Sequence, residues 1–149
     1  MAGPAPRSLS EQELQQILTE GKFGVLASVR ATGYPHLSTV LYRWSQDERT
    51  LRISTTEDRL KPRHFRADPH AALHVRRDDW AFAVAEGEAE VTAPSTEAGD
   101  AVGRELLDMA REFVAEGAEE AFLAEAVAER RVVIRIKVAR LYGTALDVA

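Results

Sequence analysis

Cysteine is absent from this sequence of 149 residues. Its absence excludes disulfide bonds, thiolate metal sites and a thiol nucleophile. No apolar run approaches the ~20 residues that a membrane-spanning helix needs. The first residues, MAGPAPRSLSEQE, lack the apolar segment of a secretory signal. We therefore expect a cytoplasmic protein with no membrane partner.

An excess of positive charge is absent as well. The chain has 19 Lys and Arg against 24 Asp and Glu, which gives a formal net charge of −5. General affinity for nucleic acid depends on many cations that neutralise phosphates, so we expect no nucleic-acid partner. The four histidines form no HExxH zinc motif, and the sequence has no G-x-S-x-G, G-x-G-x-x-G or G-x-x-x-x-G-K motif. We assign no metal site, no hydrolase triad and no classical nucleotide loop.

The patterns that are present predict one mainly β domain. Short runs rich in β-branched and aromatic residues, separated by polar or glycine-containing turns, predict six strands at residues 23–29, 36–44, 50–56, 70–76, 80–93 and 131–139. Leu141-Tyr142-Gly143 is expected to turn away after the last strand, and Gly87 indicates a β-bulge or a close backbone approach. Short turns between most strands indicate an antiparallel barrel decorated with helices.

Three helical regions accompany these strands. Ser10 and Glu13 form a capping-box pattern for a first helix that ends at Gly21. A short helix is expected at residues 59–67, and a longer helical region at 95–128 with a break near Gly117. We expect residues 1–9 to be a flexible tail and residues 10–149 to form a single domain, the usual size for one core.

The stretch ISTTEDRLKPRHFRADP at residues 53–69 combines hydroxyls with cations. The strand predicted there ends in three hydroxyl residues, Ser54, Thr55 and Thr56. Arg59 and Lys61 follow at the start of the short helix. Hydroxyls and backbone N–H groups donate to phosphate oxygens, and cations neutralise the phosphate charge. Arg59 can offer a bidentate fork and Lys61 a mobile point charge, so the stretch indicates a phosphorylated small molecule.

Other interpretations of the polar and aromatic residues stay open at this point. A solvated basic helix face explains the cations equally well, and we expect Arg63 and Arg66 to reach a distal acidic group or solvent. His36 and the polar residues that follow it are explained by a polar strand face. Trp80 and Phe82, which share one strand face, fit a core or a dimer interface better than a cofactor contact.

Read in order, several segments resemble the flavin-reductase-like split β-barrel superfamily that includes pyridoxamine 5′-phosphate oxidase. They are most similar to its actinobacterial branch that uses the deazaflavin coenzyme F420. The matching segments are GYPHLSTV at 33–40, ISTT at 53–56 with Arg59 and Lys61, RADP at 66–69, DWAFAVAEG at 79–87 and RRVV at 130–133. The order and spacing of these segments carry the resemblance, which extends over residues 23–143.

The resemblance implies a fold and an assembly. The fold is a six-stranded antiparallel split β-barrel of the α+β class, mainly β, with peripheral helices. Two such chains form a homodimer with two cofactor sites in the grooves between protomers. The phosphate is then expected beside the end of the strand at residues 50–56, and the redox-active ring along the strand at residues 37–40. Trp80 and Phe82 are expected to come from the partner subunit. The implied cofactor-binding residues are Leu37, Ser38, Thr39, Val40, Ser54, Thr55, Thr56, Arg59, Lys61, Trp80 and Phe82.

Two departures from pyridoxamine 5′-phosphate oxidases favour F420 over FMN. The segment DRLK at residues 58–61 separates its cations as in the F420 branch, whereas the oxidases have adjacent Arg and Lys. The chain also lacks their long C-terminal substrate-binding segment. The resemblance therefore implies an F420-dependent oxidoreductase that moves a hydride between reduced deazaflavin and a small unsaturated or conjugated substrate, with no protein side chain assigned as catalytic. The alternatives are an FMN-dependent oxidoreductase of the same fold and a non-catalytic protein that binds a cofactor or haem.

Overall fold

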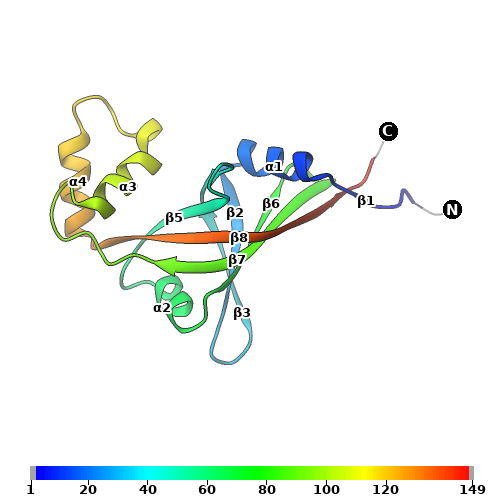
Figure 1. Cartoon of the computed structure of the whole chain (residues 1–149), viewed down its shortest axis with the longest axis horizontal. Helices are drawn as coiled ribbons and strands as arrows, with labels where there is room; N and C mark the ends of the chain where they lie inside the picture. The colour runs from blue at the N-terminus through cyan, green and yellow to red at the C-terminus, as the bar shows by residue number, and fades with distance from the viewer. Residues whose placement is uncertain (1–2, 148–149) are drawn as a thin grey trace.

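One curled antiparallel sheet organises the computed structural model, which describes residues 3–147 (Figure 1). Its strands are β1 (Arg7–Ser8), β2 (Phe23–Val29), β3 (Pro35–Leu41), β4 (Arg43–Ser45), β5 (Thr50–Thr56), β6 (His70–Arg76), β7 (Ala81–Val91) and β8 (Arg131–Ala145). They follow the spatial order β3-β2-β6-β7-β8-β5-β4, and β1 pairs with β8. The structure confirms the predicted antiparallel split β-barrel with peripheral helices.

The predicted number of six strands is wrong, because residues 3–147 form a sheet of eight. The run predicted at 36–44 divides at Tyr42 into β3, which pairs with β2, and β4, which pairs with β5. Tyr42 is only 3% exposed, and its hydroxyl donates to the Leu18 carbonyl at 2.6 Å. The buried ring thus marks the point where the chain leaves one edge of the sheet and joins the other.

The last strand is also longer than expected. Residues 141–143 do not turn away but continue β8 to Ala145, paired with β7 throughout. Gly143 permits this pairing because a Cβ at that position would overlap the carbonyl oxygen of Phe82. The predicted irregularity at Gly87 is confirmed as a register shift between Glu86 and Gly87.

The helices pack at the periphery of the sheet. They are α1 (Glu11–Glu20), α2 (Leu60–Ala67), α3 (Ala101–Met109), the 3₁₀-helix η1 (Arg111–Phe113) and α4 (Glu119–Ala128). The capping box of α1 is confirmed, since Ser10 Oγ accepts from Glu13 N at 3.2 Å and Glu13 Oε1 from Ser10 N at 3.1 Å. Gly117, with φ of 83°, lies in the predicted break before α4. Figure 1 shows α3 and α4 together at the end of the molecule opposite the chain termini; we call α3, η1 and α4 the helical cap.

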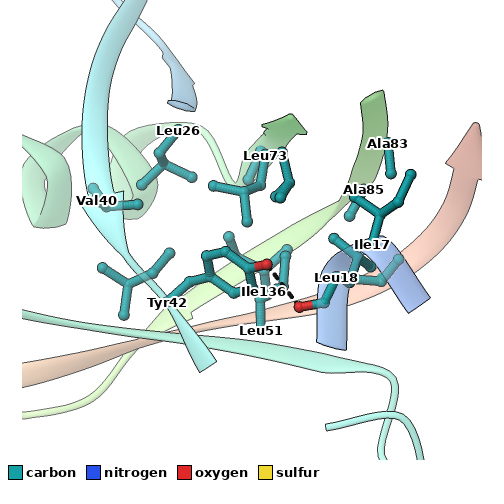
Figure 2. Packing of buried hydrophobic residues seen from close by; sticks show 14 of the residues in the cluster. Ile17, Leu18, Leu26, Val40, Tyr42, Leu51, Leu73, Ala83, Ala85 and Ile136 are labelled. Carbon is teal, nitrogen blue, oxygen red and sulfur yellow. Dashed lines mark hydrogen bonds between the residues drawn. The ribbon is translucent and has the colours of Figure 1, made fainter. Parts of the chain in front are cut away.

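The main core lies inside the curled sheet and is closed by α1 (Figure 2). Leu26, Leu51, Leu73 and Ile136 from four different strands are at most 1% exposed, and Leu18 of α1 packs among them. A second, smaller cluster beneath the helical cap contains Leu106, Ala126 and Val133. Across residues 3–147, no helix combines the length and the apolar character that crossing a membrane requires.

The region predicted as an N-terminal tail contributes to this fold. Arg7 and Ser8 pair with Ala145 and Thr144 at the end of β8, and Leu9 is buried in the main core. Burial of Leu9 and the two backbone pairs explain why the chain is ordered against the sheet before α1 begins. Residues 1–2 of the predicted tail and residues 148–149 of the predicted domain lie outside the described residues.

Asp100 holds the start of the helical cap, and its removal should destabilise the protein. Its carboxylate accepts hydrogen bonds from Ser95 Oγ at 2.8 Å, Thr96 N at 2.9 Å, Glu97 N at 3.2 Å and Gly103 N at 2.8 Å. Burial raises the pKa of this carboxyl, but the four hydrogen bonds outweigh that effect and hold its pKa at about 2. We expect Asp100→Ala to lower the free energy of unfolding at pH 7 by about 1–2 kcal/mol, as for other lost helix caps.

The same residue predicts a pH dependence that urea unfolding can measure. Because the folded-state pKa lies below the ordinary value of about 4, the contribution of Asp100 is present above pH 4 and is lost as the pH falls toward 2. The stability difference between wild type and Asp100→Ala should therefore shrink on acidification. Asp108→Ala, on the exposed side of α3, is the matched control and should change stability little at either pH. Equal stability of wild type and Asp100→Ala at pH 7 would contradict the prediction.

Candidate functional site

Two free strand edges face one another where the barrel is split. Among the described strands, β3 pairs only with β2. On its side away from β8, β5 is paired by β4 only at residues 50–52, which leaves residues 53–56 free. A pocket of about 600 Å³ lies between them, lined by residues 39–43 on one side and 52–55 on the other. Edge strands present unpaired N–H and C=O groups, so the pocket offers a flat ligand hydrogen bonds from the backbone.

The helical cap supplies a third, mostly apolar wall. Its apolar lining residues are Leu106, Met109, Ala110, Phe113, Phe122 and Ala126, and Glu125 of α4 lines it as well. Arg43 of β4 fastens this wall to the sheet, because its Nε donates to the Met109 carbonyl at 2.7 Å and its Nη2 pairs with Glu112 at 2.6 Å. Its guanidinium also lies 5.6 Å from the ring centroid of Phe113. The wall is therefore held in place by residues distant in the sequence.

The end of the pocket near α2 is polar and carries positive charge. Ser54, Thr55, Lys61 and Arg131 all line it. Lys61 is partly buried, and no ion pair joins it to a carboxylate among residues 3–147. Burial lowers the pKa of Lys61, and the neighbouring Arg59 guanidinium lowers it further. A bound anion would oppose both effects, so this end of the pocket suits a phosphate.

Five of the residues predicted from the sequence meet in this pocket: Thr39, Val40, Ser54, Thr55 and Lys61. Thr56, predicted beside the phosphate, lies just outside the lining and donates through its hydroxyl to Asp58 Oδ1 at 2.7 Å. Arg59 is exposed at the N-cap position of α2 and does not line the pocket. Thr56 and Arg59 therefore shape the turn into α2, and within one chain Lys61 is the cation of α2 that reaches the site.

The other predicted residues lie elsewhere within the single chain. Leu37 is 61% exposed on the outer face of β3. Ser38 points the other way, and its Oγ is buried without a hydrogen-bond partner among the described residues. Trp80 is exposed just before β7, and Phe82 stacks on His74 with ring centroids 5.0 Å apart. The roles predicted for Trp80 and Phe82 involve a second subunit and stay predictions, as do the ring contacts predicted for Leu37 and Ser38.

Arg131 is a site residue to which the sequence assigned no role. It begins β8 directly after α4, and the β5–β8 register places it opposite Thr56. Its Nη1 donates to Ser54 Oγ at 3.1 Å, so it lies beside one of the predicted phosphate ligands. In the sequence, Arg131 stands out only as part of the RRVV segment of the resemblance, and its place beside Ser54 follows from the register of β5 and β8.

An apolar face covers the outside of β2 and β3, away from the core. Phe23 lies opposite Leu41 in the strand register, Val25 opposite Thr39, and Ala27 opposite Leu37. Directly opposed residues share a face of the sheet. The large apolar side chains on this face are Phe23, Val25, Leu37 and Leu41, and each is at least 36% exposed. An exposed apolar patch of this kind is typical of a protein interaction site.

Comparison with known proteins places this architecture in a family. Residues 10–145 match the family described as pyridoxamine 5′-phosphate oxidase. The fold is similar to that of an FAD-binding protein from Mesorhizobium loti, with a TM-score of 0.66 and 23% identity over 95% of this chain and 97% of that chain. It is also similar to a conserved hypothetical protein from Mycobacterium tuberculosis (TM-score 0.71, 20% identity, 95% and 88% covered) and to an F420 reductase (TM-score 0.62, 21% identity, 85% and 94% covered). These likenesses show a shared fold, and the chain belongs to the pyridoxamine 5′-phosphate oxidase family.

Proposed function

We propose that the protein is an F420-dependent oxidoreductase that moves a hydride between reduced deazaflavin and a small unsaturated or conjugated substrate. The observation that carries the proposal is the pocket at the split of the barrel, where free strand edges meet Lys61, a cation with no carboxylate partner within residues 3–147. An F420 reductase is among the proteins of similar fold. The separated cations Arg59 and Lys61 also resemble those of the F420 branch.

The residues present suit the phosphate and the ring of such a cofactor. Ser54, Thr55 and Lys61 would hold the phosphate with two hydroxyl donors and one ammonium group. The free edge of β3 at residues 39–41 would donate and accept backbone hydrogen bonds along the polar edge of the ring. F420 supplies the hydride chemistry when it is bound, so this chain needs only to bind and orient the reactants. This division of roles explains why no acid–base pair is recognisable in the sequence.

The apolar wall of the pocket indicates the kind of substrate. Met109, Phe113 and Phe122 line the side formed by the helical cap. The arginines that line the pocket have carboxylate partners: Arg43 pairs with Glu112, Arg52 with Glu48 and Glu105, and Arg131 with Glu129. Glu125 also lines this side. A flat, largely apolar molecule is therefore favoured on this side over a strongly anionic one.

A second copy of the chain is part of the proposal. It would cover the apolar face of β2 and β3 and bring Trp80 and Phe82 to the partner's cofactor site. We expect Phe23→Asp to weaken the dimer, because an isolated charge on a buried apolar interface is costly. Mass measured by light scattering after gel filtration should fall from two chains toward one. Phe113→Asp, on the helical cap, is the matched control and should leave the mass unchanged; an unchanged mass for Phe23→Asp would contradict this interface.

FMN is the second candidate cofactor. It carries a phosphate and a flat ring as F420 does, and an FAD-binding protein shares the fold. The same pocket would then hold the phosphate through Ser54, Thr55 and Lys61. A protein that is yellow as purified, with a flavin absorption spectrum, would favour FMN.

A paired titration tests the proposed function. Apoprotein is titrated with F420 and with FMN, followed by cofactor fluorescence, and reduced F420 is then offered quinones and conjugated enones as acceptors. We expect F420 to bind more tightly than FMN and reduced F420 to be oxidised only when enzyme and acceptor are both present. Tighter binding of FMN than of F420 would make FMN the cofactor of the proposed oxidoreductase. Tight F420 binding without turnover would indicate a non-catalytic carrier. Binding of neither cofactor would overturn the proposal.

A further inference from the structure

Glu129 and Arg131 form an ion pair at the polar end of the pocket. Glu129 is the C-cap residue of α4 and Arg131 begins β8, and between them Arg130 adopts a left-handed φ of 53°. This turn places the two side chains together, with Arg131 Nε and Nη2 each 2.8 Å from Glu129 Oε2. Both residues line the pocket, so the pair faces the proposed phosphate position.

Arg131 is positioned to contact a ligand that reaches the end of β5. Its Nη1 donates to Ser54 Oγ at 3.1 Å, while Thr55 and Lys61 line the same pocket. A phosphate held by Ser54 and Lys61 would therefore lie within reach of the Arg131 guanidinium. Arginine binds phosphate in a bidentate manner, which is stronger than a single neutral hydrogen bond.

The existing ion pair is of the kind that a ligand can displace. The side chains of Arg131 and Glu129 are 35% and 36% exposed. Exposed pairs contribute little to stability because solvent screens them. Exchange of the Glu129 carboxylate for a phosphate would therefore cost the protein little, and the freed carboxylate would return to water.

We infer that Arg131 is a second cation of the phosphate site and that Glu129 competes with the phosphate for it. The inference rests on the proposed function only in requiring a phosphorylated ligand. Glu129 thereby lowers the affinity for the ligand phosphate. Removal of its charge should strengthen binding, an outcome opposite to that of removing a structural ion pair.

Glu129→Gln tests the competition. We expect this variant to bind F420 about threefold to fivefold more tightly than wild type, since exposed ion pairs are worth up to about 1 kcal/mol and 1.4 kcal/mol is tenfold. The matched control is Glu125→Gln, one turn earlier on α4, which removes an equal charge from the pocket lining without touching Arg131. The deazaflavin chromophore without its phosphate-bearing tail should bind both variants and wild type equally. Unchanged or weaker F420 binding by Glu129→Gln would overturn the inference, as would equal gains in the two variants.

Arg131→Met tests the cation itself. Its affinity for F420 should fall about tenfold, the effect of one charge-assisted hydrogen bond. Arg131→Lys, which keeps the charge but not the planar fork, should recover part of that loss. Thermal unfolding with inorganic phosphate provides a test that does not depend on the cofactor. At constant ionic strength, phosphate should raise the melting temperature of wild type more than that of Arg131→Met.

These arms separate the two proposals. Wild type that binds no F420 but is stabilised by phosphate through Arg131 would overturn the proposed function and support the inference. If wild type and Arg131→Met bind F420 with the same affinity and gain the same stabilisation from phosphate, the inference is overturned and the proposed function is supported. Far-ultraviolet circular dichroism of each variant establishes that its fold is intact before the affinities are compared.

Discussion

Replacing Lys61 with alanine should weaken F420 binding by about tenfold to a hundredfold while leaving the protein folded. A hydrogen bond from a charged group contributes about 1.5–3 kcal/mol, and each 1.4 kcal/mol corresponds to a factor of ten in affinity. Lys61 lines the pocket without a carboxylate partner among the described residues, so its loss leaves no buried counter-charge behind. Fluorescence titration of F420 measures the affinity, and thermal unfolding reports that the fold is retained.

Neighbouring cations provide the controls for Lys61. Arg63 is exposed on the same helix and does not line the pocket, so Arg63→Ala should bind F420 as wild type does. Arg59→Ala should have a smaller effect than Lys61→Ala, because Arg59 lies outside the pocket at the start of α2. Equal affinities of wild type and Lys61→Ala for F420 would show that the cations at the start of α2 form an ordinary solvated surface.

The charge on Lys61 also predicts how binding depends on pH. Burial, followed by the charge of Arg59, lowers the pKa of Lys61 from its ordinary value of about 10. The ammonium form binds the phosphate and is present below that lowered pKa, so affinity should fall as the pH rises through it. Lys61→Ala lacks this group, and its weaker binding should show no such alkaline decline.

Local sequence patterns predicted most of the elements that position the site. The capping box at Ser10 and Glu13 and the strand at residues 50–56 depend on neighbouring residues, and both are present. The irregularity at Gly87 is also present, and a glycine within a strand pattern indicated it. The break at Tyr42 was not predictable in the same way, because it depends on a ring that enters the core and reaches Leu18. Gly143 was interpreted as a turn, since its close approach to β7 depends on strand pairing.

The same distinction applies to the candidate site. The hydroxyl residues 54–56 and Lys61 are close together in the sequence, and three of them, Ser54, Thr55 and Lys61, line the pocket. Arg131 is far away along the chain and reaches Ser54 only through the register of β5 and β8. The apolar wall comes from the helical region predicted at residues 95–128, and no local pattern there indicates a pocket, because these helices line one only where they face the split of the barrel. Trp80 and Phe82 depend on a partner chain and remain predictions.

Gly87→Ala should lower the free energy of unfolding by about 3 kcal/mol, the upper part of the usual range for overpacking a core. A Cβ at residue 87 would overlap the carbonyl oxygen and carbon of Lys137, which belong to the backbone of β8 and cannot rotate away. Urea denaturation monitored by circular dichroism measures the loss. Gly3→Ala is the matched control, since nothing lies within 4 Å of a Cβ there and its stability should equal that of wild type.

The expected loss is large because Gly87 lies where β8 is paired on both sides. Residues 131–137 of β8 pair with β5, residues 134–138 also pair with β7, and past the bulge residues 140–145 pair with β7 in a register shifted by one residue. A methyl group that forces Lys137 away from β7 would also move the part of β8 that holds Arg131 against Ser54. Gly87→Ala should therefore weaken F420 binding as well as lower the stability. If the variant unfolds at the same urea concentration as wild type, β8 can shift without a loss of stability and the prediction is wrong.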